Sequence, residues 1–283
     1  MNRHQMIKEI EGLRGLPTLP TVAMEVNRML KDMETPIEKL VALLEKDQAM
    51  ALKILRLVNS SFYGFKSKIS SLRHAITLMG YNTVQNAVVV VSVIDSLSVS
   101  GKLKGFDITN FWPHSIRVAV MSRHLACLSK LSVPEDAFTA GLIHDIGKVV
   151  LVNHFPEVFV TVMESTAADG ISFFDSEKKH GTYAHNLVGN VLAMKWMLPE
   201  SLASAIRFHH NDTGRDVEAL TGLVTVADTL VNLMDGMKGH RLQPEMIPTV
   251  VRDPINKILK DSSRWYPTVN REMATACDFF IKR

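Results

Sequence analysis

Apolar residues recur along this chain at intervals of three and four, the spacing that places them on one face of an α-helix. Two such runs are Leu40–Leu44 and Met50–Val58. The segment Thr35–Glu38 precedes the first run with an N-cap hydroxyl, a proline at the first helical position and a glutamate three residues after the cap. Alternating strand patterns are scarce, and Val88–Val91 is the main stretch that fits a strand as well as a buried helix. The pattern predicts an all-α protein.

Histidine and aspartate interrupt the apolar runs in the second half of the chain. Within Gly141–Lys148, the adjacent His144 and Asp145 lie among apolar residues. A buried carboxylate is costly unless a cation or hydrogen-bond donors offset its desolvation, and imidazole is the commonest protein ligand of transition metals. If the segment is one helix, His144 and Lys148 share a face, and Lys148 can reach an anion held there. Taken alone, the pair favours a simpler interpretation, a helix end at which Asp145 pairs with Lys148.

Other side chains that can bind metals change that balance. The chain has 11 histidines, and several of them open or close apolar runs, while one aspartate lies inside such a run. One polar residue on an apolar face usually has its hydrogen-bond partners within the core. This many along half a chain indicate that the side chains gather at one site. The residues concerned are His114, His185, His209, His210 and Asp228. The remaining histidines are better explained as surface or hydrogen-bonded residues: His4, His74, His124, His154, His180 and His240.

The order of these residues resembles the metal-dependent phosphohydrolases of the HD superfamily. The N-terminal half resembles the HDOD branch of that superfamily, the HD-related output domain of bacterial signalling proteins. The motifs that carry this resemblance are Leu16–Pro20, Leu55–Ser60 with Tyr63 and Gly64, Ser71–Gly80 and Trp196–Pro199. Together they cover roughly residues 10 to 235 in a fixed order, which makes the resemblance more specific than any single motif.

The resemblance implies a fold, a ligand set and a cofactor. The expected fold is a helical N-terminal subdomain followed by an HD-like helical bundle. The expected cofactor is a divalent metal, with two ions of iron or manganese favoured and magnesium, zinc or nickel also compatible. Asp145 and Lys148 become the candidate catalytic residues, with Lys148 as the phosphate contact. The candidate ligands are His114, His144, Asp145, His185, His209, His210 and Asp228.

Two departures from the family pattern narrow these expectations. Asn110 stands where relatives with an additional metal carry glutamate, which argues against a third ion. After His210 the chain lacks the Gly-Tyr-Pro element of the relatives that degrade cyclic di-GMP, which argues against that substrate.

Composition excludes several classes of protein. Net charge is +3 over 283 residues with dispersed lysines and arginines, so a nucleic-acid partner is not expected. Cys127 and Cys277 form no CxxC pattern, and the N-terminal residues lack the apolar core of a secretory signal. The apolar run Ala87–Ile94 is too short to span a bilayer. We therefore expect a cytoplasmic protein without a membrane partner.

The predicted organisation has three parts. Residues 1–108 form the helical N-terminal HDOD subdomain, residues 109–236 the HD-like subdomain with the metal site, and residues 237–283 a helical C-terminal tail. The tail carries its own helical pattern around Ile255–Leu259 and Ala274–Ile281.

Two functions of different classes fit this sequence, and whether the protein is an enzyme stays open at this point. The favoured hypothesis is a bacterial regulatory protein that keeps the metal centre and is a phosphohydrolase of a nucleotide or other phosphoester. The alternative is a non-catalytic module with a structural metal, which binds a signalling protein or small phosphorylated ligand through Asn59, Tyr63 and the Leu16–Pro20 segment. A homo-oligomer is compatible with both. A di-iron oxygenase ranks last, because nothing marks an organic substrate pocket.

Overall fold

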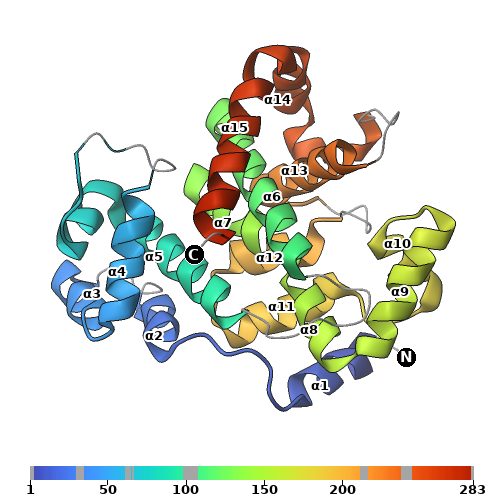
Figure 1. The fold of residues 1–283 in the computed structure, drawn as a ribbon, viewed down its shortest axis with the longest axis horizontal. Coiled ribbons are helices and arrows are strands. Elements are labelled where there is room, and N and C mark those ends of the chain that lie inside the picture. Colours follow the sequence, from blue (N-terminus) through green and yellow to red (C-terminus); the bar gives the residue numbers. More distant parts are fainter. Residues whose placement is uncertain are drawn as a thin grey trace. The chain divides into compact units, whose positions relative to one another are not determined.

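The computed structural model describes residues 3–29, 35–60, 65, 67–97, 108–210, 216–236 and 244–281. All regular structure within these ranges is helical, which confirms the predicted all-α class (Figure 1). The chain forms two compact units. Unit 1 consists of Met1–Leu16, Val99–Lys195 and Glu200–Arg283, and unit 2 of Pro17–Ser98 and Trp196–Pro199. The sequence-based division at residues 108 and 236 stays a prediction.

Unit 2 is built around α5, a long apolar helical segment with a kink at Gly80, whose φ is 81°. Its helices are α2 (Thr21–Met29), α3 (Ile37–Leu44), α4 (Gln48–Val58) and α5 (Leu72–Ser96). The ambiguous segment Val88–Val91 is helical and buried within α5. Among the described residues α5 is long and apolar enough to cross a membrane, but 56% of its apolar window is buried inside the structure, as in a core helix.

The start of α3 differs from the prediction. Thr35 was expected to cap the helix, and this was wrong: α3 begins at Ile37, and its N-cap is Pro36 in an extended conformation. The Thr35 hydroxyl instead donates a hydrogen bond to the carbonyl oxygen of Met29 at 2.9 Å. The end of α4 was predicted correctly, since Asn59 is its C-cap.

The segment Trp196–Pro199 belongs to unit 2, although it joins two helices of unit 1. The Trp196 indole is buried and donates from Nε1 to the Pro17 carbonyl at 2.9 Å. The buried Asn27 donates from Nδ2 to the Trp196 carbonyl at 3.3 Å and accepts from Gln85 at 3.2 Å. Met197 adopts the left-handed region with φ of 54°, which is uncommon for a residue other than glycine. The polar groups of this connection are therefore satisfied inside unit 2.

Unit 1 is a bundle centred on α6 (Ile108–Ser129), against which α7, α13, α14 and α15 pack. Its other helices are α1 (Arg3–Gly12), α7 (Pro134–Ile143), α8 (Ile146–His154), α9 (Pro156–Asp169), α10 (Phe173–His180), α11 (His185–Lys195), α12 (Glu200–Phe208), α13 (Ala219–Asp235), the short 3₁₀ helix η1 (Pro244–Met246), α14 (Thr249–Lys260) and α15 (Ser262–Ile281). Figure 1 shows α15, the last helix of the chain, lying along α6. The helical patterns predicted for the C-terminal tail are confirmed.

His114 lies inside α6, which begins at Ile108 and continues through Pro113. Helix α7 begins at Pro134, a residue that suits the first helical position because its missing N–H would have no partner there, and Val133 is its N-cap.

Asn59 connects the end of α4 to the segment before α5, and its removal should destabilise unit 2. Its Nδ2 donates to the carbonyls of Leu55 at 2.7 Å and Ile69 at 2.8 Å, and its Oδ1 accepts from the Ile69 amide at 2.8 Å. We expect Asn59→Ala to lower the free energy of unfolding by about 1–2 kcal/mol in urea titrations, because the buried Ile69 backbone loses its partner. Leu52→Ala, an exposed change on α4, is the control and should have a much smaller effect. Equal effects would contradict this role for Asn59. Tyr63, its neighbour in the family motif, lies outside the described residues.

Candidate metal centre

His144 and Asp145 lie at a break between two helices. The segment Gly141–Lys148 is not one helix but contains the helix end that the simpler interpretation placed at Asp145: α7 ends at Ile143, α8 begins at Ile146, and Asp145 has non-helical dihedral angles. Both side chains are buried, at 0% and 2% exposure. The break leaves His144 Nε2 3.4 Å from Asp145 Oδ2, so both groups face one buried space.

A close approach between α8 and α11 brings His185 to this pair. Gly147 has no room for a side chain, because a Cβ there would lie 1.9 Å from the His185 carbonyl oxygen and 2.7 Å from the Gly189 nitrogen. Glycine at position 147 thus lets the two backbones touch. As a result, His185 at the start of α11 places its Nε2 3.1 Å from Asp145 Oδ1.

The candidate ligands form two groups that share Asp145. In the first group, His114, His144 and Asp145 have ligand atoms within 4.8 Å of one another. Asp228 from α13 joins them, with its Oδ1 3.1 Å from His114 Nε2 and 3.7 Å from His144 Nε2.

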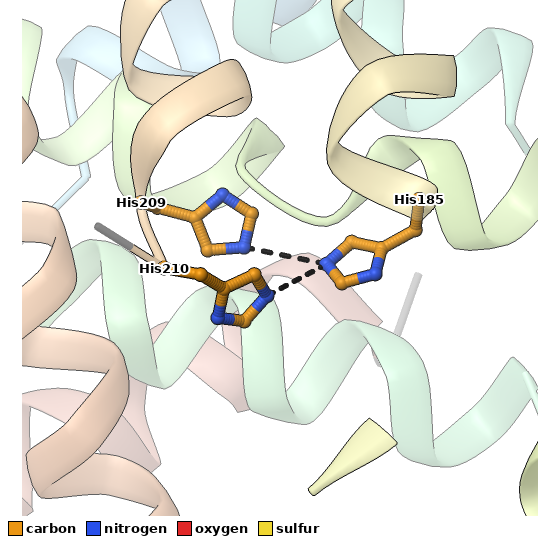
Figure 2. Close-up of side chains that lie close together, drawn as sticks. All are labelled: His185, His209 and His210. Carbon is orange, nitrogen blue, oxygen red and sulfur yellow. Dashed lines mark hydrogen bonds between the residues drawn. The ribbon is translucent and has the colours of Figure 1, made fainter. Parts of the chain in front are cut away.

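The second group consists of three imidazoles. His185 Nε2 lies 3.4 Å from His209 Nε2 and 3.0 Å from His210 Nε2, and Figure 2 shows His209 and His210 facing it from the end of α12. Asp145 Oδ1 is also 3.7 Å from His209 Nε2. One carboxylate therefore lies between the two groups, with Oδ1 toward one and Oδ2 toward the other.

The outward ring nitrogens of His144 and His209 each have a hydrogen-bond partner. His144 Nδ1 lies 2.7 Å from the Gly141 carbonyl, and His209 Nδ1 lies 2.8 Å from the Ile206 carbonyl. A carbonyl only accepts hydrogen bonds, so each Nδ1 carries the hydrogen and each Nε2 faces the cluster. His144 Nε2 and Asp145 Oδ1 are buried without a hydrogen-bond partner among the described residues. Buried lone pairs that lack a hydrogen-bond partner, such as these, fit a bound cation.

The charges of the buried carboxylates also favour a bound cation at this site. Burial by itself lowers the pKa of His144, but the Asp145 and Asp228 carboxylates outweigh burial and raise it to about 10. Burial, reinforced by His144, lowers the pKa of His209 to about 3. The buried carboxylates thus attract positive charge onto the first group, and a divalent cation would supply that charge in place of protons.

Lys148 lies beside the cluster, at its partly exposed side. Its Nζ donates to Asp145 Oδ2 at 2.6 Å, so the pair that the simpler interpretation expected is present. It coexists with the histidine cluster and leaves Asp145 Oδ1 facing the imidazoles. Lys148 is also within 5.0 Å of the centre of the Phe173 ring.

Two acidic residues at the site were missed by sequence reasoning. Glu177 of α10 is 1% exposed and contacts His185, and Asp235 at the end of α13 lies 3.9 Å from His114 Nδ1 and pairs with Arg117. Glu177 stands in the polar segment Asp175–His180, whose pattern is that of a solvated helix, so no signal distinguished it. Of the other histidines, His124 packs against Trp265, with ring centres 5.0 Å apart.

The profile of the HDOD domain family matches residues 16–212. This chain belongs to the HDOD family. An HDOD protein of unknown function from Geobacter sulfurreducens shares its fold, with a TM-score of 0.76, 24% identity, and coverage of 99% of this chain and 98% of that one.

The curated proteins that match by sequence include the following two. An uncharacterised protein of Treponema pallidum is 25% identical over 247 residues, covering 86% of this HDOD chain and 47% of the relative. A ribonuclease Y of Mycoplasma mycoides is 28% identical over 168 residues, covering 58% of this chain and 33% of the relative. The HDOD chain thus spans about half the length of the first relative and about a third of the second.

Gly147→Ala tests whether the close approach of α8 and α11 assembles the site. The new Cβ must push the helices apart, so we expect a loss of about 1–3 kcal/mol in unfolding free energy and a reduced capacity for Mn²⁺. Gly12→Ala in α1 is a matched control, because a Cβ there meets nothing within 4 Å. Thermal unfolding and equilibrium dialysis measure the two effects. If Gly147→Ala binds as much Mn²⁺ as the wild type, the contact between α8 and α11 is not what assembles the site.

Proposed function

We propose that this HDOD protein keeps an HD-type dinuclear metal centre and hydrolyses a phosphoester, such as a nucleotide, within bacterial signalling. The observation that carries the proposal is the convergence of seven side chains of the types that can bind metals on one buried space, with the Asp145 carboxylate between two groups. Buried polar groups of this number and sign need a cation to satisfy them. The similarity to a ribonuclease supports chemistry on phosphodiesters.

The residues divide naturally between two ions. His114, His144 and Asp228 would hold one ion, His185, His209 and His210 the other, and Asp145 would bridge them. Mixed imidazole and carboxylate donors suit iron or manganese, with magnesium, zinc or nickel compatible. When bound, such a pair of ions activates a water molecule and neutralises phosphate oxygens.

The chain itself would orient the substrate. The Lys148 side chain is 20% exposed, and its ammonium group, paired with Asp145 at the edge of the cluster, would turn to an incoming phosphate. The Phe173 ring, with its centre 5.0 Å from Lys148 Nζ, would help to hold the ammonium group in place. We assign Lys148 to binding a phosphate oxygen and Asp145 to bridging, in a cytoplasmic protein whose partner is a signalling protein or small phosphorylated ligand.

A specific observation favours a second candidate, a non-catalytic module with a structural metal. The Lys148 ammonium already pairs with the Asp145 carboxylate at 2.6 Å, so it is less free to bind a phosphate. Unit 2 moreover contributes none of the seven side chains, which leaves it available for binding a partner.

Asp145→Ala separates the two candidates. For the wild-type protein, purified without chelators, elemental analysis should give about two equivalents of iron or manganese, and hydrolysis of bis(p-nitrophenyl) phosphate should be detectable. The variant should lose the metal and at least about 100-fold of the activity, with its helical content retained. The exposed His180→Ala is the control and should keep both.

The outcomes discriminate as follows. Metal-dependent turnover that disappears in Asp145→Ala supports the enzyme. Two bound ions without turnover on any phosphoester, together with a large fall in thermal stability in the variant, support the structural metal. A variant with full metal content would show that Asp145 is not a ligand.

A further inference from the structure

Glu177 makes two hydrogen bonds to one residue of the cluster, His185. Its Oε1 accepts from the His185 backbone amide at 2.8 Å, and its Oε2 lies 2.8 Å from His185 Nδ1. A glutamate with 1% exposure is unusual unless its charge is paired. Here both carboxylate oxygens are committed to the residue that opens α11.

The contact determines which ring nitrogen of His185 faces the cluster as a ligand. An ionised carboxylate only accepts hydrogen bonds, so Nδ1 must carry the hydrogen that Oε2 accepts. The lone pair of the neutral ring is then on Nε2, the atom 3.1 Å from Asp145 Oδ1 and 3.0 Å from His210 Nε2. Glu177 therefore holds His185 in the tautomer and orientation that a metal ligand requires.

His185 differs in this respect from its neighbours. The Nδ1 atoms of His144 and His209 face backbone carbonyls, which are neutral acceptors. A carboxylate behind an imidazole makes the ring a stronger donor to a metal than a carbonyl does. The bonds to Glu177 therefore bear most directly on the group of His185, His209 and His210.

Helix α10 is fixed so that Glu177 stays in place. The buried Ser176 hydroxyl donates to the Val162 carbonyl of α9 at 2.9 Å, and the Glu177 carbonyl accepts from the Thr182 amide at 3.2 Å. One turn earlier, Phe174 stacks on His210, with ring centres 4.1 Å apart and planes inclined by 14°. The same short helix thus supports two of the three imidazoles.

We propose that Glu177 is a positioning residue of the metal centre, which fixes the ring of His185 and sets the affinity of the ion held by His185, His209 and His210. This inference rests on the proposed dinuclear centre. No site residue was predicted in α10. The inference makes this helix a determinant of the affinity for one of the two ions.

Glu177→Gln is the sharpest test. Glutamine keeps the volume and can still accept from the His185 amide, but it then presents an NH₂ group to Nδ1. That group favours the opposite tautomer, with hydrogen on Nε2, where the metal must bind. We expect one of the two Mn²⁺ affinities, measured by calorimetry, to fall by about 10–100-fold while the other changes little. Nitrogen-15 spectra of zinc-loaded protein should show a protonated His185 Nδ1 in the wild type and its loss in the variant.

Two further variants complete the design. Asp175→Asn makes the same change of carboxylate to amide on an exposed residue of α10 and should leave both Mn²⁺ affinities unchanged. Glu177→Asp keeps the charge with a shorter side chain and should recover part of the lost affinity, which keeps the test valid if Glu177→Gln folds poorly.

Each result has a distinct meaning. Both affinities unchanged in Glu177→Gln, or a lowered melting temperature with the ratio of affinities preserved, overturns the inference and leaves the proposed function standing. Two ions in the wild type without phosphoester turnover defeats the proposed hydrolase, while the effect of Glu177 on affinity still supports the inference. A wild-type protein that takes up no Mn²⁺ overturns both.

Discussion

The burial of one carboxylate, Asp145, is the constraint around which unit 1 is organised. Moving an isolated carboxylate out of water is far more costly than the net stability of a domain allows, so its surroundings must offset that cost. Lys148, His144 and His185 do so from three elements, each with a polar atom within 3.4 Å. Each of these groups is itself buried or half-buried and needs its own partner. The requirement therefore spreads outward, to Gly141 behind His144 and Glu177 behind His185.

The helices meet this demand through backbone contacts. Gly147 lets α8 and α11 approach until main-chain atoms touch, because a Cβ there would clash with the backbone of α11, while a Cβ at Gly189 would press mainly on the Ile206 side chain. Side-chain packing alone tolerates shifts, because rotamers adjust, whereas two backbones in contact leave little freedom. The geometry between Asp145 and His185 is thus set by main-chain contact, which suits a site that needs ligand atoms placed within a few tenths of an ångström.

Much of this arrangement could be predicted from the sequence, and the exceptions have physical reasons. Helical periodicity predicted the all-α class, and the order of histidines and aspartates identified residues that the fold brings together. Glu177 was not predicted as a site residue because its segment has the polarity of a surface helix. Its burial depends on elements distant in the sequence, which a local pattern does not reveal. The helix end at Asp145 and its pair with Lys148 were available from the sequence, but the local pattern did not show that this pair and the histidine cluster occur together. The prediction that Thr35 caps α3 failed because its hydroxyl donates a hydrogen bond to the preceding Met29 carbonyl and does not cap the helix that follows.

The connection Trp196–Pro199 bears on how this chain can be dissected. A fragment beginning near α6 would keep the tryptophan but lack the Pro17 carbonyl and the Asn27 amide to which it is bonded. The indole, in the connection between α11 and α12, would then lose these partners and become exposed. Exposed apolar surface of this kind promotes aggregation, which we expect of any excised C-terminal half. The two units therefore cannot be separated by one cut in the sequence, and any fragment made for expression should retain Pro17–Ser98 with the residues that follow.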